Sequence, residues 1–427
     1  MKRARYALPL CLVFVLGTVT GCEDDTKSTD DGSVDTTPGG EVGPGDDAGP
    51  GDATPDRPTG DLGPDGPRPP SKWETIQDPS APRVDDHTVT LLGNGKVLIA
   101  GGNTYDGTDD HYQDKAHLYD PASQKFESGG TMTVARGEHT ATLLVDGRVL
   151  VTGGKNDTDY LESTELFDPT KAVAQAWSKG PDMAKSRWSH TATLLQSGEV
   201  LIAGGFYSSG STPSIVIYVP SSNTWKFPSA QLNVARRGHT ATLLPNGKVV
   251  FTGGIQGSGS IWSTDYFDSI EIYDPATGKM TLSKVTMSKQ RNGHSATLLA
   301  DGKVLIVGGV CLNDCKSDAK QVDDIYDPST DTIVAVQHAG DLPSTHIAVR
   351  LDDKRVLVAG DTDKATAARA VAYEPVGGGF WTTLPDMAIG RWSAQAAKLK
   401  DGKVLVVGGV KESSPYEYAD KAELFHP

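Results

Sequence analysis

The side chains that could do chemistry in this 427-residue chain recur at a fixed spacing. A histidine stands fourteen residues before a glycine in six copies, and an alanine replaces it in a seventh: His87, His139, His190, His239, His294, His346 and Ala394. An arginine stands three residues earlier in five copies: Arg136, Arg187, Arg236, Arg291 and Arg391. Imidazoles bind metals, and arginines bind anionic groups. These two series are therefore the first candidates for a functional site.

Two of the four cysteines lie close together. Cys311 and Cys315 are separated by three residues. In an exported protein, two such cysteines indicate a disulfide, and no histidine-rich segment nearby supports a zinc site. We therefore predict a Cys311–Cys315 disulfide and no metal or other cofactor.

The N-terminus predicts export. Lys2, Arg3 and Arg5 precede an apolar stretch from Leu8 to Val19 that is too short to span a bilayer, so residues 1–21 read as a signal peptide. The stretch ends in Val19-Thr20-Gly21-Cys22, which resembles the lipobox of bacterial lipoproteins. The resemblance implies that Cys22 is acylated and holds the protein in a bacterial cell envelope, at the outer membrane or cell surface rather than the inner membrane. An ordinary signal peptide containing a cysteine is the alternative.

Residues 22–72 have the composition of a linker. Residues 23–72 hold ten glycines, nine prolines and no aromatic residue, with a net charge of −9. Such a segment buries too little apolar surface to fold, so we expect disorder. Calcium binding by its aspartates is the alternative, although their spacing matches no ordered calcium loop. Residues 73–427 are also acidic, at −9, which argues against nucleic acid as a partner and against docking on anionic lipid.

The rest of the chain is built from one repeated unit. Glycine doublets such as Gly101-Gly102 follow apolar runs 48 to 55 residues apart, with one degenerate copy at Gly360-Asp361. In most copies an Asn-Gly or Asp-Gly turn joins two short strands, a third strand ends in an aromatic-Asp-Pro sequence, and a Trp or Phe often marks a fourth. Four strands in about fifty residues make one propeller blade. The sequence therefore predicts an all-β, seven-bladed β-propeller over residues 73–427.

These motifs resemble the kelch repeat, and the resemblance covers nearly all of 73–427. It implies a fold rather than a function, because kelch domains carry unrelated activities. The last copy stops at Phe425-His426-Pro427, one strand short, whereas Trp73 aligns with the fourth-strand tryptophans. We therefore expect the N-terminal strand near Trp73 to complete the last blade and close the ring.

The loops between the second and third strands should share one face, and their sequences differ from copy to copy. Variable loops on a rigid scaffold usually carry function. They offer aromatic residues that suit sugars or peptides, of which we take these as candidates: Tyr105, Tyr207, Trp262, Tyr266 and Tyr416. The alternative is that long loops merely tolerate such residues.

The repeated arginines and histidines carry the same two interpretations. The arginines could hold an acidic ligand at the channel mouth, as in some kelch domains, or could bond carbonyls of a neighbouring blade. The histidines could meet in the channel, but a seven-bladed channel is too wide for a metal with bonds of about 2.0–2.2 Å. For both series the structural role is favoured, with the histidines forming hydrogen bonds between blades.

The repeats resemble those of two propeller enzymes, galactose oxidase and sialic acid mutarotase. The first carries copper and a Tyr–Cys crosslink, and all four cysteines of this chain already have other expected roles. No local motif matches the second, and no catalytic signature such as G-x-S-x-G or H-E-x-x-H is found. The leading prediction is a monomeric, membrane-tethered binding module for a protein or carbohydrate. The alternative is a sugar-active propeller enzyme.

Overall fold

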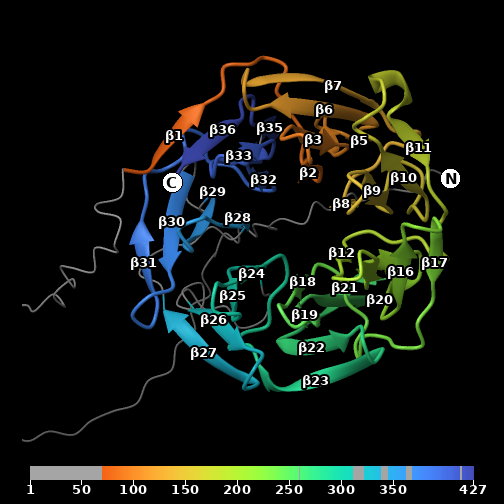
Figure 1. The fold of residues 1–427 in the computed structure, drawn as a ribbon, viewed down its shortest axis with the longest axis vertical. Helices are drawn as coiled ribbons and strands as arrows, with labels where there is room; N and C mark the ends of the chain where they lie inside the picture. The colour runs from red at the N-terminus through yellow and green to blue at the C-terminus, as the bar shows by residue number, and fades with distance from the viewer. Residues whose placement is uncertain (1–69, 259, 311–321, 338–344, 362–367, 414–415) are drawn as a thin grey trace, which may run out of the picture. The chain divides into compact units, whose positions relative to one another are not determined.

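Each sequence repeat folds into a four-stranded antiparallel sheet, and seven such blades form a ring (Figure 1). The computed structural model describes residues 70–427 except 259, 311–321, 338–344, 362–367 and 414–415. Residues 1–69 form a separate unit outside the described residues, which leaves out the expected signal peptide, Cys22 and most of the linker. Cys311 and Cys315 also lie outside the described residues.

The strands of the first four blades follow in chain order. Blade 1 holds β2 (Thr88–Leu91), β3 (Val97–Ala100), β6 (Lys115–Asp120) and β7 (Lys125–Thr131). Blade 2 holds β8 (Thr140–Leu143), β9 (Val149–Thr152), β10 (Thr164–Phe167) and β11 (Trp177–Lys179), with a 3-10 turn at Val173–Gln175. Blade 3 holds β12 (Thr191–Leu194), β13 (Val200–Ala203), β16 (Ile215–Val219) and β17 (Thr224–Lys226). Blade 4 holds β18 (Thr240–Leu243), β19 (Val249–Thr252), β22 (Ser269–Asp274) and β23 (Lys279–Thr286).

The remaining blades complete the ring. Blade 5 holds β24 (Ser295–Leu298), β25 (Val304–Val307), β26 (Val322–Asp327) and β27 (Thr332–Gln337). Blade 6 holds β28 (Thr345–Arg350), β29 (Val356–Asp361), β30 (Ala368–Glu374) and β31 (Phe380–Thr383). Blade 7 holds β32 (Gln395–Lys398), β33 (Val404–Val407), β36 (Glu423–His426) and β1 (Lys72–Thr75). The first strands of adjacent blades contact one another around the whole ring, including β2 with β32.

The core lies between the blades. The second strand of each blade is a short apolar run, such as Val97–Ala100 or Val404–Val407, and its residues are buried. Each such strand packs on both faces, as a continuous apolar run of this length predicts. One cluster joins Val97 and Ile99 of blade 1 to Leu405 and Val407 of blade 7, so the core is continuous across the ring closure.

Five of the blades are also held on their outside by an aromatic pair between the third and fourth strands, whereas blades 4 and 5 pair Tyr273 with Met280 and Tyr326 with Ile333. Phe167 and Trp177 lie 5.1 Å apart between ring centroids, and Tyr218 and Trp225 lie 5.3 Å apart. The indole nitrogens of both tryptophans donate to carbonyls of the preceding blade region, at Gly129 and Pro181. The tryptophans therefore tie the outer strands to their neighbours.

The predicted closure of the ring is confirmed. β1 pairs antiparallel with β36, with Trp73 opposite Phe425, and Figure 1 shows the orange β1 beside the blue β36. The rings of Trp73 and Phe425 lie 5.0 Å apart, and Trp73 Nε1 donates to the carbonyl of Pro385 at 2.8 Å. Trp73 thus makes the same contacts as Trp177. The pairing covers the edge that β36 would otherwise expose.

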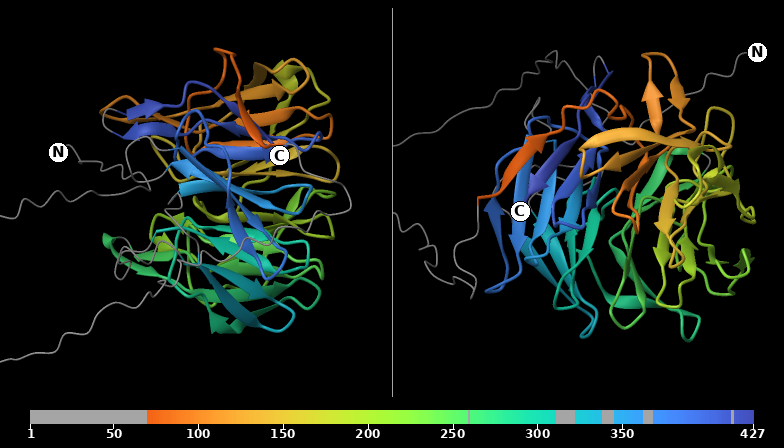
Figure 2. Two further views of the ribbon diagram at one scale, coloured as in Figure 1. Left: turned by 90° about the vertical axis from the view of Figure 1, so that its left-hand side faces the viewer. Right: turned by 45° about the horizontal axis from the view of Figure 1, so that its top comes forward.

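The loops between second and third strands form hairpins of their own on one face. They are β4 (Asn103–Tyr105) with β5 (Asp110–Tyr112), β14 (Phe206–Tyr207) with β15 (Gly210–Ser211), β20 (Ile255–Ser258) with β21 (Ser260–Tyr266), and β34 (Val410–Ser413) with β35 (Tyr416–Tyr418). The left view of Figure 2 shows orange, green and blue hairpins projecting on the same side. The loops also contact one another, since β15 pairs with β20 and the N–H of Tyr105 donates to the Tyr418 hydroxyl at 2.6 Å.

The tight turns between first and second strands lie on the other face. At Asn94-Gly95 the backbone of Gly95 has φ +89°, a conformation that favours glycine. No helix of the described residues is long and apolar enough to cross a membrane.

Candidate functional site

The glycine doublets receive the next blade. A Cβ on Gly101, which has φ +63°, would lie 2.4 Å from the carbonyl oxygen of Arg136 and 2.8 Å from the His139 ring. The N–H of Gly102 donates to that same Arg136 carbonyl at 2.9 Å. The arrangement returns at Gly153-Gly154 with the next blade, and the N–H of Gly409 donates to Val84 across the ring closure. We call this contact the inter-blade joint; any side chain at the first glycine would open it.

Five of the six repeated histidines form the predicted hydrogen bonds to hydroxyls of the preceding blade, whereas both ring nitrogens of His87 lack a partner. His139 Nε2 lies 3.1 Å from Thr88 Oγ1 of the preceding blade, and His190 Nε2 lies 2.9 Å from Thr152 Oγ1. Burial lowers the pKa of these imidazoles, to about 4 for His87 and about 3 for His239, so they are neutral. Within the described residues, no three His, Cys, Asp or Glu side chains come close enough to hold a metal ion.

The five repeated arginines point into the blades rather than toward solvent. Arg136 is fully buried, and its guanidinium donates to the carbonyl of Gly153 at 2.7 Å and to Glu165 Oε1 at 2.9 Å. Glu165 also accepts the backbone N–H of Thr133 at 2.7 Å, in the segment that crosses from blade 1 to blade 2. Three further copies repeat this buried pair: Arg236–Glu271, Arg291–Asp324 and Arg391–Glu423.

The side chains of these arginines bond within their own blade, not the neighbouring blade that the sequence suggested. Their backbone carbonyls reach the preceding blade instead. Arg187 is the exception to the pairing, because Val216 stands where the other blades have an acid. Its guanidinium donates to the carbonyls of Gly204 and Ser214, and burial lowers its pKa to about 10. All five are arranged as structural clamps of the blade.

Beside each joint lies a position that varies. The residue two before each histidine forms a bridge with the residue that follows the glycine doublet: Asp85 with Asn103, Gly137 with Lys155, Trp188 with Phe206, Arg237 with Ile255, Asn292 with Val310, and Trp392 with Val410. The backbone geometry is therefore repeated while the side chains change from acid to base to aromatic. These positions border the channel on the face of the variable loops.

Eight side chains there form what we call the mouth cluster. They are Asp85, Asp86, Glu138, Lys155, Trp188, Phe206, Arg237 and Asn292. Trp188 and Phe206 lie 5.3 Å apart between ring centroids, and the more exposed Tyr160 lies 6.0 Å from Trp188. The ammonium of Lys155 lies 4.7 Å from the Trp188 ring and the guanidinium of Arg237 lies 4.9 Å from it. Both distances are those of cation–π contacts.

Several polar atoms of the mouth cluster are buried without a hydrogen-bond partner in the structure. They are Trp188 Nε1, Arg237 Nε and Nη1, Asn292 Oδ1 and Asp85 Oδ1. A glycine makes room for one of them, because a Cβ on Gly238 would lie 1.9 Å from Asn292 Oδ1. Buried groups of this kind cost about 1–3 kcal/mol each when unpaired, so a ligand that satisfied them would be stabilised.

Backbone strain coincides with the same place. In blades 1 to 5 and 7 the residue before the repeated histidine or Ala394 has positive φ, and in blades 2 to 5 its N–H donates to the corresponding carbonyl of the preceding blade, as from Glu138 to Asp86 at 3.0 Å. Blades 4 and 5 use Gly238 and Gly293, whereas Asp86, Glu138 and Ser189 adopt φ 50° and Ser393 adopts φ 54°. Non-glycine residues in this region cost about 1–3 kcal/mol, and such strain concentrates at functional sites. A side chain is therefore retained in blades 1, 2, 3 and 7 where a glycine would relax the backbone.

The blade 1 side of the mouth cluster is acidic, but its carboxyls resist ionisation. Burial, with the charges of Asp110 and Glu138, raises the pKa of Asp85 to about 7. Burial and the charge of Glu138 raise the pKa of Asp86 as well. Glu138 itself pairs with Lys155 at 2.7 Å and accepts the Ser189 hydroxyl. Although burial opposes it, the carboxylate of Glu138 raises the pKa of Lys155.

The aromatic residues predicted from the loops are spread more widely. Tyr266 lies near the mouth cluster, where burial raises its pKa against the opposing charge of Arg237. Tyr207 packs under the ammonium of Lys185 at 5.3 Å, and the hydroxyl of Tyr105 donates to the Gly107 carbonyl. For Trp262 and Tyr416 the structure describes the backbone alone, in β21 and β35. The sequence analysis missed Trp188, Arg237 and Asn292, which stand in the variable column beside the repeated histidines.

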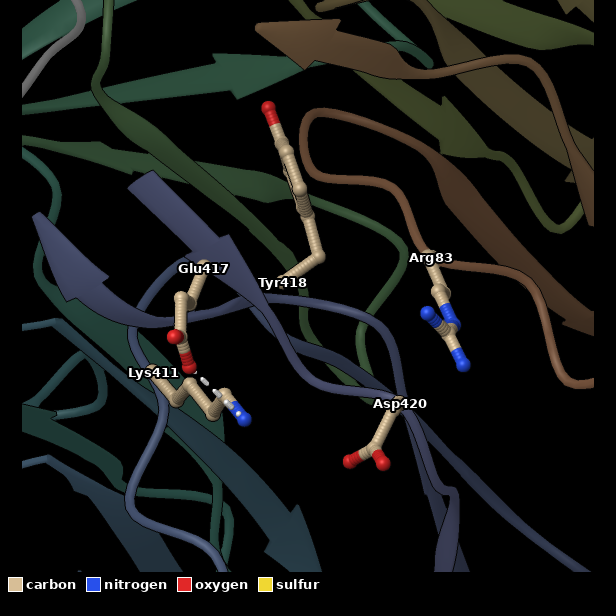
Figure 3. Close-up of a pocket in the computed structure, with 5 residues that line it drawn as sticks. All are labelled: Arg83, Lys411, Glu417, Tyr418 and Asp420. Carbon is tan, nitrogen blue, oxygen red and sulfur yellow. Dashed lines mark ion pairs between the residues drawn. The ribbon is translucent and has the colours of Figure 1, made fainter. Parts of the chain in front are cut away.

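A hollow lies beside the ring closure. Its cavity of about 360 Å³ is lined by Arg83, Lys411, Glu417, Tyr418 and Asp420 (Figure 3). Lys411 and Glu417 neutralise each other at 2.9 Å, as the dashed line in Figure 3 marks. The Tyr418 hydroxyl holds the neighbouring loop through Tyr105. With its charges partly paired and a single aromatic ring, this hollow is a weaker candidate than the mouth cluster.

Comparison with known proteins identifies related sequences. Residues 86–309 match the family model described as the KLHDC2/KLHL20/DRC7 Kelch-repeats domain. Galactose oxidase of Gibberella zeae is 27% identical over 342 residues, which cover 68% of this chain and 45% of that protein. Kelch-like protein 36 of Bos taurus is 23% identical over 235 residues, covering 54% and 36%. This chain therefore spans less than half the length of these curated relatives.

A solved structure shares the fold. It is described as a novel fungal alcohol oxidase with catalytic diversity among the AA5 family, in complex with copper, and it superposes with a TM-score of 0.62 at 17% identity, covering 84% of this chain and 76% of that one. In this chain the imidazoles of His139 and His190 lie against threonine hydroxyls of the preceding blade.

The raised pKa of Asp85 predicts a pH-dependent effect of Asp85→Asn. A carboxyl whose folded pKa lies above its unfolded value loses its favourable contribution as pH rises through the folded pKa, here about 7. At pH 8 the wild type must hold a buried charge, so Asp85→Asn should raise the free energy of unfolding by on the order of 1–3 kcal/mol. At pH 4 the two proteins should unfold alike. Denaturant unfolding at both pH values measures this, with exposed Asp109→Asn as the control; equal effects at pH 4 and 8 would contradict it.

Proposed function

This chain belongs to the kelch-repeat family of β-propellers, and from that premise we propose that it is a binding module whose mouth cluster takes a carbohydrate ligand. The observation that carries the proposal is the group formed by Trp188, Phe206 and Tyr160 with two cations over its faces. The scaffold beneath it repeats in every blade, whereas this group occurs once. Because the inter-blade joint forms without this aromatic group in the other blades, the group is not needed for the fold.

The chemistry of the mouth cluster suits a sugar. Ligand sites are mostly apolar and aromatic surfaces with a few placed polar groups. Aromatic rings can cover the C–H face of a pyranose, while Asn292 Oδ1 and Trp188 Nε1 supply one acceptor and one donor for hydroxyls. The similarity to galactose oxidase, whose name gives a sugar as its substrate, supports carbohydrate over protein. A protein ligand is the alternative that the kelch-like relative keeps open.

A sugar-active enzyme is the second candidate, and one observation favours it. Asp86 has a raised pKa beside Glu138, which pairs with Lys155. Two carboxyls whose environments separate their protonation states can serve as general acid and general base. With such a pair, the protein would act on the sugar that the mouth cluster binds. Turnover of a bound sugar, lost in Asp86→Asn, would distinguish this candidate from binding alone.

We also propose that the module is tethered to a bacterial cell envelope through a lipid on Cys22. The signal-like residues 1–21 and the Gly/Pro-rich spacer support this proposal. Replacing Cys22 by Ala should move the protein from the membrane fraction to the soluble fraction on cell fractionation. Membrane association that is unchanged in Cys22→Ala would rule the tether out.

Tyr160→Ala tests the binding site without disturbing the core, because the Tyr160 ring is 41% exposed. Losing one stacking face should weaken sugar binding by about 1 kcal/mol, or roughly fivefold in Kd. A glycan array identifies the bound sugar and isothermal titration calorimetry gives its affinity. The control is Phe227→Ala, which removes an aromatic ring that is exposed to a greater degree, after the outer strand of blade 3. Equal losses in both variants, or no sugar bound by the wild type, would refute the proposal.

A further inference from the structure

Arg237 differs from the clamp arginines in what its guanidinium contacts. Arg136 and Arg236 each donate Nη atoms to a carbonyl and a buried carboxylate. Among the described arginines, Arg237 alone has a buried Nη1 without a hydrogen-bond partner; its Nε is unpaired as well, which it shares with clamp arginines such as Arg136. Among the described residues no carboxylate forms an ion pair with it. The unpaired Nη1 is the donor that a ligand would satisfy if it displaced the side chains that cover it.

Aromatic rings hold this guanidinium in place. Its central carbon lies 4.9 Å from the Trp188 ring and 5.3 Å from the Phe206 ring. Such contacts stabilise the cation and fix its plane while leaving the N–H edge free. The planar edge of a guanidinium matches the two oxygens of a carboxylate, which it can bind with two parallel hydrogen bonds.

The charges around Arg237 favour an anion as well. The nearby Glu138 carboxylate is already engaged by Lys155 at 2.7 Å and by the Ser189 hydroxyl. Burial lowers the pKa of Arg237, a cost that a bound anion would offset. The raised pKa values of Asp85 and Asp86 keep those carboxyls from opposing the anion below neutral pH.

The other unpaired atoms define the rest of the ligand. Asn292 is 4% exposed and presents Oδ1 as an acceptor beside Gly238. Trp188 is 9% exposed and presents Nε1 as a donor. A ligand that satisfies these atoms needs hydroxyl groups in addition to its carboxylate.

We propose that Arg237 binds the carboxylate of an acidic sugar, so that the mouth cluster selects a uronic acid over the corresponding neutral sugar. This inference rests on the proposed function, since it names the class of carbohydrate that the same site takes. An acidic peptide offers the carboxylate but lacks the hydroxyl-rich ring that the remaining atoms require.

The test compares galacturonate with galactose, which differ in the carboxylate, by isothermal titration calorimetry of the full chain at pH 6. The wild type should bind galacturonate at least about tenfold more tightly, as a bidentate charged pair implies. Arg237→Gln should abolish this preference, and Arg237→Lys should restore part of it. The control is Arg148→Gln, a tight-turn arginine paired with Asp146, which should leave the preference intact.

The outcomes separate the two proposals. Equal binding of both sugars by the wild type, or a preference that survives in Arg237→Gln, overturns the acidic-sugar inference while the proposed function stands. Binding of neither sugar by the wild type overturns the inference, and an empty glycan array overturns the proposed function with it. Binding of a poly-glutamate peptide in place of galacturonate would assign the site to an acidic peptide instead. The wild-type comparison decides the matter even if a variant fails to fold.

Discussion

The inter-blade joint is the constraint on which the rest of this structure depends. At five of the seven joints a glycine with positive φ receives both the carbonyl and the histidine ring of the next blade, at distances that leave no room for a Cβ. The buried Arg–Glu pairs then fix the crossover segment on the far side of the joint. Removing one partner of such a pair would leave a buried charge and cost about 3–5 kcal/mol. The ring therefore tolerates little change at these positions.

Because the joint is rigid, functional side chains can be placed at the two positions that precede each repeated histidine. The positions next to each histidine have their backbone set by the joint, so a side chain placed there is aimed at the channel mouth whatever its chemistry. Blades 1 to 4 use that freedom for Asp86, Glu138, Trp188 and Arg237. The strained φ of Asp86 and Glu138 shows that these side chains are kept at a cost in stability. The scaffold and the candidate site thus use neighbouring residues of the same short segment in each repeat.

The fold could be predicted from sequence because its determinants repeat. The spacing of fourteen residues that separates His139 from Gly153 recurs in every blade, with Ala394 replacing the histidine in the last. The alignment of Trp73 with Trp177 predicted the closure of the ring. The candidate site could not be found in the same way, since Trp188 and Arg237 each occur once at their position. The sequence feature that distinguishes them is variation: the residue two positions before the repeated histidine differs from copy to copy. The repeated arginines were taken as candidate ligand residues although their repetition reflects a structural role in each blade. Their partners could not be predicted, because Glu165 lies 29 residues from Arg136 in the sequence and beside it in the fold.

We propose that the ligand binds on the face of the variable loops and not on the face of the tight turns. Hydrogen–deuterium exchange with and without saturating galacturonate distinguishes the two faces. We expect slower exchange in peptides covering residues 155–161 and 206–214, beside Lys155 and Phe206, with no change at the turns around Gly95, Gly147 and Gly247. Slower exchange confined to those turns, or none anywhere in the ring, would contradict it.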